Sequence, residues 1–459
     1  MKIAFCSSEV FPFAKTGGLA DVVAALPAAL VESGCEVKVF LPLYKNIKPE
    51  QMGDGFGISR KGKLEFFFIK NDEFYLRSGI YGTPSGDYPD NLERFTFFSN
   101  QVLKVLKEID FQPDIINCND WQTSWVNIAL KLKHGDDPFY AKTKTVLTIH
   151  NVAYQGIFDK DKFSLLGIAE KYFRPEYLEF YDKINLLKGG IIFSDLVNTV
   201  SPTYAKQIKT PEFGCGLEGV LAERGDKVIG ILNAIDYHIW DPAIDNLIDK
   251  KYSPKSLSDK KINKKGLQKE LGFKVDEDIF LLGMVSRLAE QKGVDILHQA
   301  LDEMLGKYQL VILGLGDEQY HQMLKAKSEQ FKNSFSLNLT FNESLAHKIY
   351  AGCDAFLLPS RFEPCGLSQM ISYKYATVPI VNHTGGLVDT VVDASCGGGG
   401  FVFKNYAAED LLLTLDRAKK VFDHKDQWQK ILDEIVTYNF SWEVAAKHYY
   451  EVYESLLTQ

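Results

Sequence analysis

The sequence predicts an α/β protein of two domains, each with a parallel β-sheet covered by helices on both faces. Short apolar runs rich in β-branched residues alternate with longer helix-like stretches along most of the chain. This alternation stops in a polar segment, 236–260, and then starts again. The 459 residues are 46% hydrophobic and 24% charged, so the chain can bury two large cores. Sheets of this kind bind ligands beyond the carboxyl ends of their strands, and we expect the main site in a cleft between two facing domains.

Six apolar runs predict the strands of the first domain, residues 1–240. They are 2–7, 35–42, 114–119, 145–150, 196–201 and 228–232. Helical patterns lie between several of them, at 19–33, 100–109, 121–133 and 182–193. The aromatic runs KLEFFFIK, EFYLRSGIYG and RFTFFSN, around 56–98, are interpreted as extra strands or an inserted hairpin. Because the main strands are almost continuously apolar, they are expected to be buried on both faces.

Six further runs predict the strands of the second domain, residues 241–440. They are 279–286, 309–314, 336–341, 354–360, 378–382 and 399–403. Helices are expected at 292–305, 317–331, 343–352, 367–376 and 407–421, and two more within 425–457. The polar segment 236–260 is interpreted as the crossover between the domains. The last stretch, 441–459, is expected to form a helix that packs back on the first domain.

Composition excludes several classes of protein. There are 52 Lys and Arg against 60 Asp and Glu, a formal net charge of −8, which argues against a nucleic-acid partner. Seven cysteines, none in a C-x-x-C pair, do not suggest a disulfide framework or a zinc ribbon. The first residues lack the apolar region of a signal peptide, and no run approaches the roughly 18 apolar residues of a membrane span. We therefore expect a cytoplasmic protein with no membrane partner.

Two Gly-Gly loops, one in each domain, are candidate anion sites. KTGGLAD, 15–21, follows the first strand and opens a helix, so the N–H groups of Gly17 and Gly18, the helix N-terminus and the charge of Lys15 can all attract a phosphate. HTGGLVDT, 383–390, repeats the pattern in the second domain. Either loop alone is equally explained as an ordinary glycine turn. Their recurrence predicts one diphosphate-bearing ligand held between the domains.

Cations and carboxylates at strand ends add to this prediction. In SRLAEQKG, Arg287 and Lys292 lie at a strand-to-helix junction and can clamp a diphosphate, although a surface pair of cations is as common. In SRFEPCGLSQ, Glu363 follows a strand, and its carboxylate can contact sugar hydroxyls or stabilise positive charge at a sugar carbon. The alternative for Glu363 is a residue favoured by a helix dipole. Cys365 is better explained as a packed thiol than as a nucleophile.

Two more polar residues end strands of the first domain. His150 stands in HNVAYQGIF and Asp120 in NDWQT. A core histidine and a helix cap are the competing interpretations. No metal is expected, since D-x-D matches occur only in polar turns, at 159–161 and 276–278, and no H-E-x-x-H is present. GLGDEQ, 314–319, lacks the last glycine of a dinucleotide fingerprint.

Together the motifs resemble those of bacterial glycogen synthases and plant starch synthases. The resemblance rests on KTGGLADV, HNVAYQG, NLLKGGIIFSDLVNTVSPTYAKQI, VSRLAEQKG, SRFEPCGLSQM and HTGGLVDTV, which run in order from residue 1 to about 450. It implies the GT-B glycosyltransferase fold, two Rossmann-like domains with a cleft. It also implies retaining transfer of glucose from ADP-glucose to the non-reducing 4-hydroxyl of an α-1,4-glucan, glycogen or a maltooligosaccharide, with no metal and no other cofactor.

The resemblance also assigns roles to residues. It implies a catalytic set of Glu363, Arg287, Lys292, His150 and Asp120. It implies a substrate-binding set of Lys15, Gly18, Asp21, Tyr88, Asn151, Phe341, Cys365, Gly366, Leu367, Gly385, Gly386 and Leu387. In these sets the two cations neutralise the leaving diphosphate and Glu363 contacts the donor glucose. No enzyme nucleophile is obvious, and a diphosphate oxygen can itself take the proton of the acceptor.

The sequence departs from the family pattern at four places. Asn119-Asp120-Trp121-Gln122 stands where the family has H-D-W-H, and Ala234 replaces the glycine of N-G-I-D. Phe341 takes the place of a tyrosine that stacks on the adenine, and Ala376 replaces a glycine. Two alternatives follow: an enzyme of the same fold that uses UDP-glucose or a small acceptor, and a non-catalytic glucan-binding homologue. Because the cations and Glu363 are retained, we predict an active enzyme.

Overall fold

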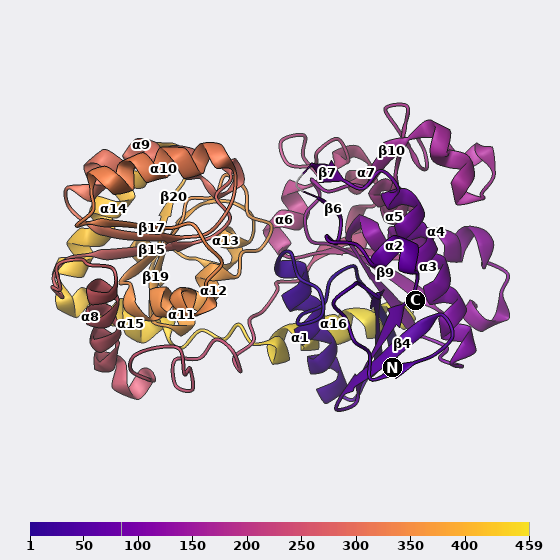
Figure 1. Ribbon diagram of the computed structural model, residues 1–459, viewed down its shortest axis with the longest axis horizontal. Helices are drawn as coiled ribbons and strands as arrows, with labels where there is room; N and C mark the ends of the chain where they lie inside the picture. Colours follow the sequence, from indigo (N-terminus) through magenta and orange to yellow (C-terminus); the bar gives the residue numbers. More distant parts are fainter. Residues whose placement is uncertain (84, 459) are drawn as a thin grey trace. The chain divides into compact units, whose positions relative to one another are not determined.

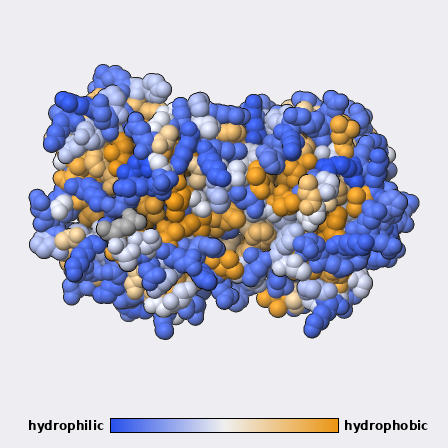
Figure 2. Space-filling model, turned by 180° about the vertical axis from the view of Figure 1, so that it is seen from behind, coloured by the Kyte–Doolittle hydropathy of each residue, from blue (hydrophilic) through white to orange (hydrophobic). Residues whose placement is uncertain are grey.

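The computed structural model describes residues 1–83 and 85–458. It divides into two compact units (Figure 1). The first comprises Met1–Asn233 and the stretch from Trp442 onward, and the second comprises Ala234–Ser441. The face drawn in Figure 2 is predominantly hydrophilic, with smaller hydrophobic areas in each unit. Among the described residues, no helix is both long enough and apolar enough to cross a bilayer.

The first unit is built on one large sheet with the strand order β14-β13-β9-β8-β1-β2-β5-β4-β3. Its parallel strands are β1 Lys2–Cys6, β2 Glu36–Pro42, β5 Leu64–Ile69, β8 Ile115–Asn119, β9 Lys144–Ile149, β13 Leu196–Thr199 and β14 Val228–Gly230. At one edge, β4 Phe56–Lys61 and β3 Gln51–Met52 are antiparallel. All six predicted strands of the first domain are present, with small differences at their ends.

The region 56–98 differs from the prediction. KLEFFFIK forms β5, which pairs in parallel with β2 and is therefore a regular strand of the sheet as well as one arm of a hairpin with β4. EFYLRSGIYG contains only the short helix α2 Asp72–Tyr75, and RFTFFSN lies inside helix α3 Asn91–Glu108. The aromatic content of RFTFFSN suggested a strand. However, Phe95, Phe98, Val102 and Leu106 are buried three or four residues apart, which is the spacing of a helix.

Four other helices of the first unit match predicted ones: α1 Gly18–Glu32, α4 Asp120–Lys133, α5 Leu186–Phe193 and α16 Trp442–Leu457. Two short helices were not predicted, α6 Pro202–Gln207 and α7 Glu218–Glu223. The expected helix 182–193 begins four residues late, because β12 Lys183–Asn185 pairs with β10 Ile157–Asp159 and β11 Glu179–Phe180. The side chain of Asn185 then caps α5 by accepting the Lys188 N–H at 2.9 Å.

The last helix completes the first unit. α16 packs against α1, at the other end of the sequence. Tyr449 and Tyr453 on α16 are fully buried, and the Tyr449 hydroxyl accepts a hydrogen bond from Asn198 Nδ2 on β13 at 3.0 Å. The helix is therefore part of the core of this unit.

The second unit has a six-stranded sheet in which every neighbouring pair is parallel. Its order is β17-β16-β15-β18-β19-β20, with β15 Leu281–Val285, β16 Gln309–Leu313, β17 Phe335–Asn338, β18 Ala355–Leu358, β19 Val378–Asn382 and β20 Phe401–Phe403. The helices are α8 Lys260–Glu270, α9 Val294–Leu305, α10 Glu318–Gln330, α11 Glu343–Gly352, α12 Ser368–Lys374, α13 Gly385–Thr390, α14 Ala408–Asp423 and α15 Lys425–Ile435. All six predicted strands of the second domain are present.

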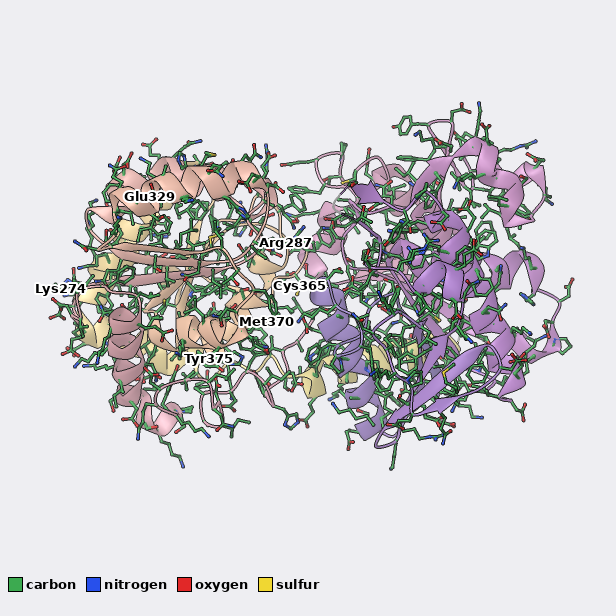
Figure 3. The ribbon with its side chains drawn as sticks, in the orientation of Figure 1. Lys274, Arg287, Glu329, Cys365, Met370 and Tyr375 are labelled. Atoms are coloured by element: carbon green, nitrogen blue, oxygen red, sulfur yellow. The ribbon has the colours of Figure 1, made fainter. Side chains whose placement is uncertain are left out.

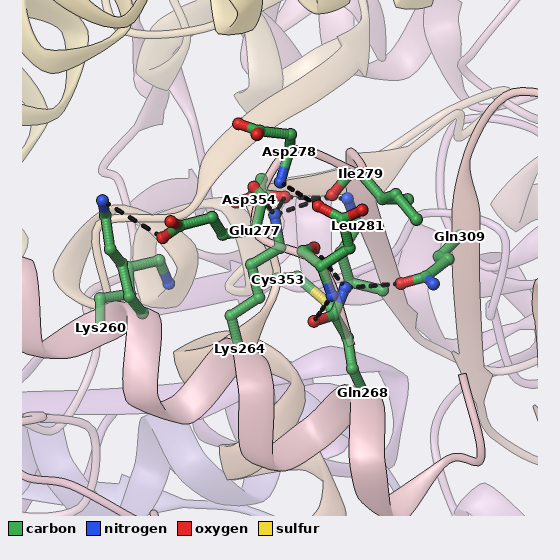
Figure 4. Close-up of polar contacts among 12 residues, drawn as sticks. Lys260, Lys264, Gln268, Glu277, Asp278, Ile279, Leu281, Gln309, Cys353 and Asp354 are labelled. Carbon is green, nitrogen blue, oxygen red and sulfur yellow. Dashed lines mark hydrogen bonds and ion pairs between the residues drawn. The ribbon is translucent and has the colours of Figure 1, made fainter. Parts of the chain in front are cut away.

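Helix α8 was not predicted because its buried face is polar. Its buried residues recur at helical spacing: Lys260, Asn263, Lys264, Leu267 and Gln268. Lys264 Nζ lies 2.6 Å from Asp354 Oδ2, and Gln268 Nε2 donates to Gln309 Oε1 at 2.8 Å (Figure 4). Lys260 Nζ donates to the carbonyl oxygens of residues 350, 351 and 375 and to the hydroxyl of residue 377. Hydrogen bonds therefore hold this helix where a hydrophobic stripe usually does.

The two units are wound in the same way. In each, the chain forms a central strand, adds strands on one side (β2 to β5 in the first unit, β16 and β17 in the second), and then crosses to add further strands on the other side. The direction of winding reverses between β1 and β8 in the first unit and between β15 and β18 in the second. Ligands bind beyond the carboxyl ends of the strands at such switch points.

Candidate active site

The switch point of the first unit carries several of the predicted residues. β1 ends at Cys6 and β8 ends at Asn119, and these strands are direct neighbours. The chain after β1 leads through Glu9 to the KTGGL loop, and the chain after β8 continues directly into Asp120 and helix α4. The topology therefore brings residues about 110 positions apart in sequence to one edge of the sheet.

Glu9 organises the KTGGL loop. Its carboxylate accepts hydrogen bonds from the Thr16 backbone N–H, from Thr16 Oγ1 at 2.5 Å and from the Gly17 N–H at 3.2 Å. The Tyr81 hydroxyl donates to the same carboxylate at 2.6 Å. Glu9 is only 3% exposed. One of the two backbone donors that the sequence suggested for an anion, the Gly17 N–H, is thus held by a carboxylate of the protein.

Asp120 and His150 lie together at the same edge. Asp120 Oδ1 accepts the backbone N–H of His150 at 2.7 Å, and the Asn151 N–H also donates to this carboxylate. Burial, and to a smaller degree the nearby Glu9 carboxylate, raise the pKa of Asp120 to about 7 against the lowering effect of these hydrogen bonds. Asp120 also has φ +56°, an unusual backbone conformation for a residue other than glycine. Burial lowers the pKa of His150 to about 3, so its imidazole is neutral at pH 7.

The remaining predicted residues of the first unit lie around this edge. Lys15 Nζ forms an ion pair with Asp21 Oδ1 at 2.6 Å, and both side chains are 39% exposed. Gly18 begins helix α1. Tyr88 lies further along the chain: its hydroxyl accepts the Gly79 N–H at 3.2 Å, and its backbone N–H donates to the carbonyl oxygen of Tyr81. Tyr88 is therefore connected to Glu9 by hydrogen bonds through Tyr81.

The switch point of the second unit holds Lys292 and Glu363 in direct contact. Lys292 Nζ lies 2.6 Å from Glu363 Oε2, and the Glu363 side chain is 7% exposed. Ser360 Oγ donates to the same oxygen at 3.0 Å. Glu363 follows β18 and Lys292 follows β15, so neighbouring strands of the sheet bring these residues together. A buried carboxylate with two donors on one oxygen is fixed in position.

Glycines allow the loops of the second unit to meet at Glu363. Gly385 has φ +48°, and a Cβ there would lie 1.8 Å from the Glu363 carbonyl oxygen. A Cβ on Gly386 would lie 2.4 Å from the Cys365 carbonyl oxygen. The Gly386 N–H donates to the Glu363 carbonyl oxygen at 3.0 Å, and the Leu387 N–H donates to Thr384. The second Gly-Gly loop is thus required for close packing against Glu363, and these two donors have partners within the protein.

The other predicted residues of this unit differ in exposure. Arg287 is exposed and donates to Gln291 Oε1 at 3.2 Å, whereas the Cys365 thiol is buried. Figure 3 shows Arg287 and Cys365 at one end of the unit and Lys274 at the other. Gly366 has φ +77°, and Leu367 directly precedes α12. Phe341, between β17 and α11, is 81% exposed.

Sequence reasoning missed three residues that arrange the candidate site: Glu9, Tyr81 and Ser360. Glu9 and Ser360 both stand within three residues of a strand end, as the selected residues do, so the same criterion could have found them. Tyr81 gave no comparable signal, because it reaches Glu9 from a region of irregular structure. Within residues 1–83 and 85–458, no group of three or more His, Cys, Asp or Glu is placed to hold a metal ion.

Two doubly wound units with charged residues at the switch point of each sheet are the architecture of GT-B glycosyltransferases, and the comparisons assign the chain to that class. Comparison with known proteins agrees with this class. The family model of the starch synthase catalytic domain matches residues 2–223, and that of glycosyl transferases group 1 matches residues 264–431.

Relatives match over the whole chain. The glycogen synthase of Geotalea uraniireducens (strain Rf4) is 44% identical, with 100% of this chain and 99% of the relative covered. Glycogen synthase 2 of Geobacter sulfurreducens is 45% identical, with 99% and 98% covered. The catalytic domain of starch synthase IV from Arabidopsis thaliana, solved bound to ADP and acarbose, superposes with a TM-score of 0.91 at 32% identity and covers 100% of this chain and 99% of that one. The chain belongs to the family of bacterial glycogen synthases and plant starch synthases.

Proposed function

We propose that this protein transfers glucose from ADP-glucose to the non-reducing 4-hydroxyl of an α-1,4-glucan with retention of configuration. Family membership over the full chain supports the reaction class. The ADP and acarbose bound to the related starch synthase support a nucleotide donor and a glucan-like acceptor. The seven cysteines are all free, which supports a reducing compartment such as the cytoplasm.

The observation that carries the proposal is the Lys292–Glu363 contact at the switch point of the second unit. In the reaction the C1–O bond to the diphosphate breaks, and ADP leaves with the electron pair. The acceptor oxygen bonds to C1, and its proton passes to a diphosphate oxygen. Positive charge develops at the sugar ring and negative charge on the diphosphate. A fixed carboxylate next to a fixed cation can stabilise both.

The first unit contributes a second set of polar groups. A neutral His150 and the half-buried Asp120 can hydrogen-bond sugar hydroxyls without the cost of desolvating a new charge. We propose that Lys15, Arg287 and Lys292 neutralise the diphosphate and that no metal ion is needed. Unchanged initial rates in excess EDTA would support metal independence, and a rate restored only by Mg²⁺ would contradict it.

A second candidate donor is UDP-glucose, and the observation that motivates it is Phe341. This ring is 81% exposed and lacks the hydroxyl of the tyrosine found in the family. Stacking on a ring face discriminates weakly between bases, so the loss of a polar contact can broaden donor choice.

The test is an activity matrix of ADP-glucose and UDP-glucose against glycogen, maltooligosaccharides and small glucosides. We expect ADP-glucose with glycogen or a maltooligosaccharide to give the highest rate. Glu363→Gln should lower that rate at least 100-fold, equivalent to about 2.7 kcal/mol. The control Glu329→Gln, on the exposed surface of α10, should leave it unchanged. Higher rates with UDP-glucose would favour the second candidate, and glucan binding without turnover on either donor would overturn the proposal.

A further inference from the structure

Asn119 links three elements at the switch point of the first unit. Its side-chain Nδ2 donates to the carbonyl oxygen of Cys6, the last residue of β1, at 2.9 Å. Its Oδ1 lies 2.9 Å from Nε2 of His150, which follows β9. Asn119 is 2% exposed, and its contact with Cys6 is buried while that with His150 is partly buried. The chain uses an asparagine at this position where the family pattern has a histidine.

The orientation of this amide is determined by its partners. The Cys6 carbonyl oxygen can only accept a hydrogen bond, so the group facing it must be the donor Nδ2. The other end of the amide, Oδ1, can only accept, and it faces His150. A flipped amide would place an acceptor against the Cys6 carbonyl and two donors towards the imidazole, and would lose the Cys6 contact.

This orientation decides which nitrogen of His150 carries the proton. Nε2 must donate to Asn119 Oδ1, so a neutral imidazole has its hydrogen on Nε2 and a lone pair on Nδ1. Among the described residues, Nδ1 has no hydrogen-bond partner, and it is not one of the fully buried polar atoms that lack a partner. Nδ1 is therefore open to a ligand. The backbone N–H of the same residue is held by Asp120, which restricts the position of the ring.

We propose that Asn119 is a positioning residue that fixes His150 as the Nε2–H tautomer, so that Nδ1 accepts a hydrogen bond from a substrate hydroxyl. The tautomer follows from contacts within the protein. Only the identity of its partner, a hydroxyl of the sugar substrate, rests on the proposed function. An amide does not ionise, so this support stays the same over the whole physiological pH range, whereas a histidine in the same position could change its own protonation state.

The tautomer can be measured directly. In the full-length protein labelled with ¹⁵N-histidine, two-bond ¹H–¹⁵N spectra distinguish a protonated from an unprotonated ring nitrogen. His150 is one of nine histidines and is assigned by the signals that disappear in His150→Gln. We expect the Nε2–H form from pH 5.5 to 8.5. Asn119→Ala should give a mixture of tautomers, whereas Asn100→Ala, which removes the acceptor of the Trp125 indole N–H, should not change the signals of His150. An Nδ1–H tautomer in the wild type, or an unchanged tautomer in Asn119→Ala, would overturn the proposal.

A second variant separates positioning from structural support. Asn119→Asp keeps an acceptor opposite Nε2 but adds a negative charge, so His150 should become protonated at higher pH and lose the Nδ1 acceptor. Asp120, whose carboxylate accepts the His150 backbone N–H, is the ionisable group in contact with His150, Glu9 acts on Asp120, and the Cys6 and Cys118 thiols lie on the two strands next to Asn119. All of these groups are the same in both proteins. The readout is therefore the ring ¹⁵N signals of His150, which should titrate at a pH at least one unit higher in Asn119→Asp than in the wild type. The thermal midpoints of Asn119→Asp and Asn100→Ala are compared to check that both variants are folded. His150 signals that titrate as in the wild type would refute the positioning role. If the wild type shows the expected tautomer but no glucosyl transfer, the proposed function fails and the assigned tautomer remains.

Discussion

Replacing Gly385 with alanine should inactivate the enzyme by moving Glu363 without removing any functional group. The new Cβ would lie 1.8 Å from the Glu363 carbonyl oxygen, whereas real Cβ contacts are rarely closer than 3.0 Å. The Gly385 and Glu363 backbones must therefore separate by about 1.2 Å, the difference between these two distances. A misplacement of about 1 Å at a reacting centre costs on the order of 100-fold in rate, or about 2.7 kcal/mol.

The matched control is Gly397→Ala. Gly397 also has a left-handed backbone, with φ +83°, but a Cβ there would meet no atom within 4 Å. Both variants incur the conformational cost of about 1–2 kcal/mol for alanine in this region, so both should lose similar stability from that source. Only Gly385→Ala should also lose activity.

The assay combines initial rates of glucosyl transfer with urea unfolding of both variants. We expect kcat to fall about 100-fold in Gly385→Ala and to stay within twofold of the wild type in Gly397→Ala. A folded Gly385→Ala protein that retains a third or more of the wild-type rate would refute the reasoning. In that case the position of the Glu363 backbone does not control the reaction.

Two further predictions concern stability and nucleotide binding. Burial lowers the pKa of Lys260 from 10.5 to about 7. Between these two pH values the unfolded chain therefore binds one more proton than the folded chain. The free energy of unfolding should consequently rise with pH, by up to about 1.4 kcal/mol per pH unit. Urea titrations from pH 7.5 to 9.5 should show a weaker pH dependence of the free energy of unfolding in Lys260→Met than in the wild type. An equal pH dependence in the two proteins would contradict the prediction. Phe341→Ala should raise KM for the donor about tenfold through lost stacking while leaving stability within about 0.5 kcal/mol, since the ring is 81% exposed. The same substitution at Leu413, 62% exposed, should change neither quantity, and an unchanged KM in Phe341→Ala would exclude stacking on this ring.

Sequence reasoning predicted the sheets well and some helices poorly, for a physical reason. Buried parallel strands are short continuous apolar runs, and all twelve predicted runs contain strands. Helix α8 has no apolar pattern in the sequence, because the residues on its buried face include Lys260 and Lys264, whose ammonium groups are hydrogen-bonded. RFTFFSN was wrongly interpreted as a strand because aromatic residues are typical of strands. In the structure it belongs to helix α3, whose buried residues recur every third or fourth position, and that burial depends on tertiary packing.

The candidate site was predictable as a set of positions. Glu363, Lys292, Asp120 and His150 all follow strands, and the doubly wound order brings strand ends together. The partners of individual donors were not predictable. The sequence could not indicate that Glu9 accepts the N–H groups of Thr16 and Gly17, because this depends on which side chains the fold places within hydrogen-bonding distance.

The contact between α16 and α1 has a consequence for biosynthesis. The first unit is discontinuous in sequence, since the stretch from Trp442 onward belongs to it and all of the second unit comes between. A ribosome therefore finishes the second unit before it releases the helix that completes the first. Until then α1 exposes the surface that α16 later covers, and the part of the core that Tyr449 and Tyr453 later fill is also exposed. Chaperones and other nascent chains can bind there. A fragment that ends at Asn233 would stay in that state, and a stable version of the first unit alone would need α16 joined to it by a linker.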